Sequence, residues 1–127
     1  MIQEFADWVE AQTGRTLGDT LHAGWRPDDA PDLCTVILQR VPAPRSMDGA
    51  DVDERPIQFI TRAGSYMAAE AEAKAIHAAL IHQAGHELPS LWILTITGSS
   101  PAHLGPDSTG RHEFTFNLTV RTRNFAP

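Results

Sequence analysis

The chain has 127 residues, of which 42% are hydrophobic and 20% are charged, as is typical of one soluble globular domain spanning residues 1–127. Its formal net charge of −6 disfavours direct nucleic-acid binding, because phosphate contacts need clustered lysine and arginine. The single cysteine, Cys34, excludes an internal disulfide, so nothing indicates an oxidising compartment.

The first elements follow from apolar spacing. A helix is predicted over Ile2–Thr13, with Phe5 and Val9 on its buried face and a glycine as its stop. Residues 21–25 are predicted to form a short strand, and two prolines exclude a helix from the turn-rich segment that follows. β-Branched residues then predict a strand over residues 34–41.

The middle of the chain contains a predicted loop, strand and helix. Residues 41–56 are rich in proline and acidic side chains, which predicts a long exposed loop. A strand follows over residues 57–62, and Ser65 is the predicted N-cap of a helix over residues 66–84. The helical spacing puts four apolar side chains on the inner face: Ala69, Ala73, Ile76 and Leu80.

The last third is predicted to be two strands around a long loop. Residues 91–97 are predicted to form a strand, and Leu91–Leu94 are apolar on both faces, as expected of a central strand covered on each side. Residues 98–111 are too long for a tight hairpin, so we expect a functional or disordered loop. The final strand alternates apolar and polar residues from Phe114 to Arg121. This order predicts an α+β domain: a largely antiparallel sheet of four to five strands, with two helices packed mainly on one face.

The histidines and aspartates give little support for a metal site. His82 and His86 have the i,i+4 spacing of zinc ligands on a helix, but Gly85 is predicted to end the helix between them. We interpret them as partly exposed residues near a helix C-terminus, where protonated histidine suits the helix dipole. The aspartates of residues 28–32 lack the alternate spacing of a calcium loop and are predicted to cap turns.

Other chemical motifs are weak as well. Cys34 is interpreted as a small buried hydrophobic residue, and Ser99 and Ser100 do not match the G-x-S-x-G pattern of a nucleophile elbow. The tryptophans, Trp8, Trp25 and Trp92, are predicted to lie in the core rather than to stack on bases. We therefore expect no catalytic, cofactor-binding or metal-binding residues, and no enzyme.

Two further observations bear on location and partners. The residues after Met1 are polar and acidic rather than basic and then apolar, and no apolar stretch is long enough to cross a bilayer. We expect a soluble protein that is made and used, or assembled, in the cytoplasm. Nine arginines stand against one lysine, a bias common at protein interfaces that a preference for arginine codons explains equally well.

Three stretches, in this order, resemble the tail terminator (tail-completion) and minor capsid proteins of long-tailed phages and related prophages. They are LGDTLHAGWRPDDAPDLCTVIL (residues 17–38), ERPIQFITRAGSYMAAEAEAKAI (54–76) and LGPDSTGRHEFTFNLTV (104–120). The chain departs from the family after its second strand, where the family often has a short acidic, glycine-rich turn and this chain reads QRVPAPRSMDG.

The resemblance implies a ring, typically hexameric, that caps the finished tail tube, stops its polymerisation and presents a joining surface to the head connector. The implied partners are further copies of the chain, the tail tube protein and the head–tail connector protein, without cofactor or membrane. DNA passes through the lumen without specific binding. The implied location is the head-proximal end of the virion's tail, reached after assembly in the host cytoplasm.

Candidate functional residues fall into two groups under this resemblance. Acidic residues that would face the lumen and repel phosphate come from the long loop: Asp48, Asp51, Asp53 and Glu54. Candidates for contacts between subunits or with partners are Trp25, Arg26, Asp28, Asp29, Arg45, Arg55, His103, Asp107 and Arg111.

Two other functions remain open at this point. A head-completion or connector adaptor at the head–tail joint would also act through its surfaces. A small metal-binding or ligand-binding enzyme domain would use imidazoles: His77, His82, His86 and His112.

Overall fold

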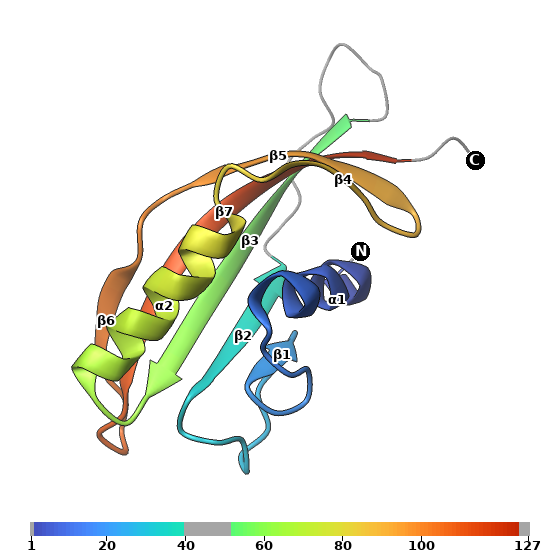
Figure 1. Ribbon diagram of the computed structural model, residues 1–127. Helices are drawn as coiled ribbons and strands as arrows, with labels where there is room; N and C mark the ends of the chain where they lie inside the picture. The colour runs from blue at the N-terminus through green and yellow to red at the C-terminus, as the bar shows by residue number, and fades with distance from the viewer. Residues whose placement is uncertain (1, 40–51, 125–127) are drawn as a thin grey trace.

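The computed structural model of the chain describes residues 2–39 and 52–124. Along them the elements are α1 (Ile2–Thr13), β1 (Leu21–Ala23), β2 (Cys34–Gln39), β3 (Val52–Ala63), α2 (Tyr66–Leu80), β4 (Ala84–Glu87), β5 (Leu91–Gly98), β6 (Ala102–Pro106) and β7 (His112–Asn124). The strands form one sheet in the order β1-β2-β3-β7-β5-β4, with β6 paired to β7 (Figure 1). Only the short β1–β2 pair is parallel within these residues. The predicted α+β class is confirmed.

Both helices pack on the same face of the sheet. Phe59 of β3 and Phe116 of β7 are register partners whose rings stack 4.8 Å apart, so they project from one face. The α1 residue Phe5 contacts Phe59 edge-on at 6.4 Å, and the α2 residue His77 contacts Phe116 at 5.2 Å. The predicted placement of the helices is therefore confirmed, and the core lies between them and the long β3–β7 pair (Figure 1).

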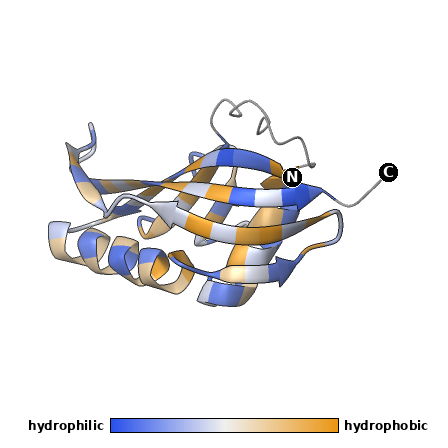
Figure 2. Cartoon of the chain, turned by 90° about the horizontal axis from the view of Figure 1, so that it is seen from above, coloured by the Kyte–Doolittle hydropathy of each residue, from blue (hydrophilic) through white to orange (hydrophobic). Residues whose placement is uncertain are grey.

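β3 and β7 form the centre of the sheet, because each has strand partners on both sides. In β7 every second residue from Phe114 to Thr122 is buried, because successive side chains of a strand point to opposite faces. Figure 2 shows this alternation as bands of orange and blue along the strands. Removing a ring from this layer, as in Phe59→Ala, costs about 3–5 kcal/mol.

Helix α2 begins as predicted and ends early. Ser65 Oγ accepts a hydrogen bond from the Ala68 amide at 3.2 Å, and Ala69, Ala73, Ile76 and Leu80 are fully buried. The helix ends at Leu80 rather than at residue 84, because Ile81 is extended and His82 adopts a φ of 65°. The next residues pair with β5 as the strand β4.

The structure corrects other predictions. The sheet has seven strands rather than four to five, because β4 and β6 were not predicted. Strand β3 begins at Val52, so the last residues of the predicted loop are strand; residues 40–51 lie outside the described part of the chain. Strand β5 is covered on one face only, and Trp92 is 38% exposed. Trp25 is also outside the core at 70% exposed, whereas Cys34 is buried as predicted.

Candidate assembly surfaces

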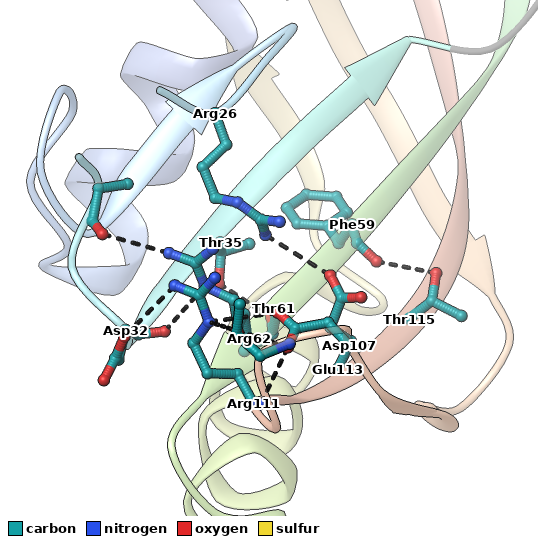
Figure 3. A network of polar contacts seen from close by, with 12 residues as sticks. Arg26, Asp32, Thr35, Phe59, Thr61, Arg62, Asp107, Arg111, Glu113 and Thr115 are labelled. Carbon is teal, nitrogen blue, oxygen red and sulfur yellow. Dashed lines mark hydrogen bonds and ion pairs between the residues drawn. The ribbon is translucent and has the colours of Figure 1, made fainter. Parts of the chain in front are cut away.

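Three arginines gather where β3 ends and β7 begins: Arg26, Arg62 and Arg111 (Figure 3). Arg26 lies in the segment after β1, and its Nη1 is 3.6 Å from Glu113 Oε2 on β7. Glu113 is also the register partner of Arg62, so the two strands bring opposite charges to the same end of the sheet. Two of the sequence-predicted residues, Arg26 and Arg111, meet here.

Arg62 is the buried centre of this group, and sequence analysis did not single it out. Its side chain is on the face opposite Phe59, yet the residue is only 3% exposed. Its guanidinium donates to the main-chain carbonyls of Ala30 and Asp32 at 3.2 Å and of Pro31 at 2.8 Å. A buried arginine needs several acceptors for its N–H donors. The carbonyls of residues 30–32, which we call the Pro-Asp turn, supply three of them. Arg62 thereby holds residues 30–32 against the sheet.

The β6–β7 turn is built around Asp107. Its Oδ1 accepts from the Thr109 hydroxyl at 2.7 Å and from the amides of Thr109 and Arg111 at 2.8 and 3.0 Å. These hydrogen bonds, led by the Thr109 hydroxyl, lower the pKa of the Asp107 carboxyl to about 2. Arg111 Nε donates to Asp107 Oδ2 at 3.2 Å, and its Nη1 lies 3.4 Å from Asp32 Oδ1. Arg111 therefore links the β6–β7 turn to the Pro-Asp turn, and its guanidinium already has partners within the fold.

An open groove lies at the β1 edge of the sheet. It has a volume of about 340 Å³ and is lined by Gln3, Leu17, Gly18, His22, Ala23, Trp25 and Pro27. Trp25 stands at this groove with 70% of its surface exposed, whereas His22 is 6% exposed and its Nε2 has no hydrogen-bond partner among the described residues. A groove lined by both apolar and polar residues, with a large exposed indole beside it, suits a protein side chain as its occupant. Asp28 and Asp29 follow in the chain and are exposed.

Asp53, Glu54 and Arg55 lie at the opposite end of β3. Arg55 pairs with Asp53 at 3.2 Å and donates to Thr122 Oγ1 at 3.1 Å, so both charges are used within the fold. Glu54 is exposed. Asp48, Asp51 and Arg45 lie outside the described residues. The predicted site residues thus do not form one cluster: Arg26, Asp107 and Arg111 are at one end of the strand, and Asp53, Glu54 and Arg55 at the other.

The histidines do not assemble as the enzyme alternative requires. His77 lies on α2 against Phe116, and His86 lies on β4 beside Trp8 at 5.1 Å. Within residues 2–39 and 52–124, no three side chains of His, Cys, Asp or Glu are placed to share a metal ion. His103 is exposed on β6, and its Nε2 lies 3.2 Å from His112 Nδ1. In the same part of the chain no helix is long and apolar enough to cross a membrane.

Comparisons with known proteins agree with this fold. No curated protein matches the sequence. A chain from the virion of a native gene transfer agent particle has a similar fold, with a TM-score of 0.50 and 17% sequence identity over 91% of this chain and 83% of that one. The family model described as bacteriophage tail terminator protein matches residues 14–124. That match contains the Pro-Asp turn, the β6–β7 turn, Trp25 and every strand of the sheet. The chain belongs to the bacteriophage tail terminator protein family.

Proposed function

We propose that this tail protein closes into a ring on the end of the phage tail tube, stops its polymerisation and forms the joining surface for the head connector. The observation that carries the proposal is the family match over residues 14–124. A terminator of this kind works by shape, because it must cover the growing end and break no covalent bond. We propose a hexamer, with the tube protein and the head–tail connector as its partners.

A closed ring of identical chains needs two unlike surfaces on each subunit. The chain offers such a pair on opposite edges of the sheet. One is the groove along β1 with Trp25 exposed beside it. The other is β6, which pairs only with β7 among the described strands and exposes Leu104 at 55%. An unpaired strand edge can add a segment of a neighbouring chain, so we assign β6 and the groove to successive subunits.

The polar residues divide into support and contact in this arrangement. Arg62, Arg111 and Asp107 have partners within the fold and hold the two turns in place. Trp25, Asp28 and Asp29 are exposed on the segment that Arg62 secures, which makes them the contact residues. In this proposal the three paired residues fix the shape of the turns, and the three exposed residues contact the next subunit or the tube.

Acidic side chains suit the lumen of such a ring, since they repel the phosphates of passing DNA. Of the predicted lumen residues that are described, Asp53 is paired with Arg55 and Glu54 is exposed on the opposite face of β3. We therefore assign the repulsion to Glu54 together with Asp48 and Asp51. Charge reversal at these three positions should slow DNA delivery from assembled particles; delivery at the normal rate would exclude them from the lumen.

Tube elongation in vitro tests the function itself. Tubes are grown from purified tube protein on an initiating complex, and the terminator is added at a small fraction of the tube subunits. Shorter tubes of uniform length are expected, because one ring ends each tube. Tubes of unchanged length would contradict terminator activity and favour the head-side adaptor.

Two variants separate the assembly surface from the fold. Trp25→Ser removes the exposed indole without opening the core and should abolish capping while the circular dichroism spectrum stays that of the parent. Lys74→Ala is the control, because Lys74 is 65% exposed on α2 with one weak ion pair to Glu70 at 3.7 Å. It should cap tubes as the parent does.

A further inference from the structure

We propose that His103 and His112 form a binding site for a divalent transition-metal ion such as Zn²⁺, Ni²⁺ or Cu²⁺, next to the β6 edge that is assigned to the subunit contact. The ligands are His103 Nε2 on β6 and His112 Nδ1 on β7, which lie on neighbouring strands and are diagonal to each other in the register. Water completes the coordination. These residues were not paired in the sequence analysis, because His103 lies inside the segment predicted to be a loop, residues 98–111, and His112 follows it.

The distance between the two nitrogen atoms fits shared coordination. They lie 3.2 Å apart. Two imidazole nitrogens bound at about 2.0–2.1 Å with a tetrahedral angle between them are separated by about 3.3 Å. The rings are inclined by 24° and their centres lie 5.4 Å apart.

Aromatic neighbours hold the rings in position. Tyr66, the first residue of α2, contacts His103 edge-on at 4.7 Å and His112 at 6.0 Å. Phe114 is the register partner of His103, is 3% exposed, and lies 5.0 Å from the His103 ring. Ligands whose orientation is fixed by packing lose little freedom on binding a metal.

The donor set selects the class of ion. Imidazole nitrogen suits zinc, copper and nickel, whereas magnesium and calcium prefer oxygen ligands. No third His, Cys, Asp or Glu joins the pair among the described residues. The adjacent Arg111 guanidinium is already paired with Asp107 and Asp32. Without metal, one ring donates an N–H to the other; on binding, the donor ring carries that proton on its other nitrogen, Nδ1 of His103 or Nε2 of His112, so that both facing nitrogens can ligate the ion.

Titration of the untagged full chain with ZnCl₂, followed by calorimetry and by NMR of the histidine ring protons, tests the site. One ion per chain is expected, with the signals of His103 and His112 moving together. Both His103→Ala and His112→Ala should weaken binding by at least the roughly 10- to 100-fold that loss of an outer-shell partner costs. MgCl₂ should move neither signal.

His82→Asn is the matched control. His82 is also an exposed histidine, and asparagine tolerates its φ of 65°. This variant should bind zinc as the parent does. Zinc binding that survives both alanine variants, zinc that moves the signals of other histidines instead, or no binding at millimolar zinc would each overturn the proposal. Because capping of tubes is a separate readout, failure here leaves the assembly proposal standing.

Discussion

Replacing Arg62 tests whether a buried guanidinium holds the Pro-Asp turn to the sheet. Arg62→Met keeps most of the side-chain volume and removes the hydrogen bonds to the carbonyls of residues 30–32. Hydrogen bonds to a charged group contribute about 1.5–3 kcal/mol each. Pro31 and Asp32 are exposed, so water replaces part of the loss. The expected decrease in the free energy of unfolding is therefore about 3 kcal/mol rather than the full sum.

The assay has a global and a local readout. Urea unfolding followed by circular dichroism gives the free energy, and a loss of about 3 kcal/mol corresponds to a melting temperature roughly 10 °C lower for a domain of this size. Hydrogen exchange at the Ala30 amide, which donates to the Pro27 carbonyl at 3.1 Å, reports on the turn. It should speed up in Arg62→Met by more than the amides of β7.

A lysine variant and a surface arginine complete the design. Arg62→Lys keeps the charge, but a single ammonium cannot reproduce the forked contacts, so an intermediate loss is expected. Arg123→Met, at an exposed position of β7, should change stability by no more than about 0.5 kcal/mol. An Arg62→Met protein as stable as the parent, with unchanged exchange at Ala30, would refute the role given to this residue.

Three further changes have defined outcomes. Gly98→Ala places a Cβ 2.2 Å from the Asn117 carbonyl oxygen and should cost about 1–3 kcal/mol of stability; Gly64→Ala, with no atom within 4 Å, is its control, and equal melting temperatures would exclude the clash. Ser65→Ala removes the cap of α2 and should cost about 1 kcal/mol by urea unfolding, whereas Ser65→Asp should not. Because the pKa of Asp107 is lowered to about 2, its stabilising contribution is complete above the unfolded-state pKa of about 4 and is lost as pH falls through about 2. Asp107→Asn should remove that part of the pH dependence, and an NMR titration midpoint near 4 in the parent would contradict it.

The elements predicted well are those whose pattern is set by their own residues. Helix α1 and the inner face of α2 follow the spacing of apolar side chains, and the alternation of β7 reports directly which face meets the core. β4 has the sequence AGHE, with no β-branched residue, and is a strand because it pairs with β5. β6 contains glycine and proline and is extended because β7 offers it an open edge. Both β4 and β6 are strands because they pair with a neighbouring strand, and the local propensity of their residues does not encode that pairing.

The candidate site was predictable only in part. The Asp107 turn could be chosen from sequence, since aspartate, serine and glycine are typical turn residues, whereas the exposure of Trp25, which was predicted to lie in the core, could not. Arg62 could not be chosen from sequence. Alternation places it on the face opposite the core, and its burial depends on a turn some 30 residues earlier in the chain. The His103–His112 contact could not be predicted from sequence either. His103 is the register partner of Phe114 and His112 that of Pro106, so the two rings meet diagonally where the register shifts between His103 and Gly105.

Averaged images of tube ends carrying the bound protein test the central claim most directly. The account predicts a closed ring of identical chains around the channel, with the β1 groove and Trp25 of one subunit against the β6 edge of the next. A single chain, or an open cluster, at the tube end would contradict it, and so would a ring whose subunits touch through other surfaces while Trp25 stays in solvent.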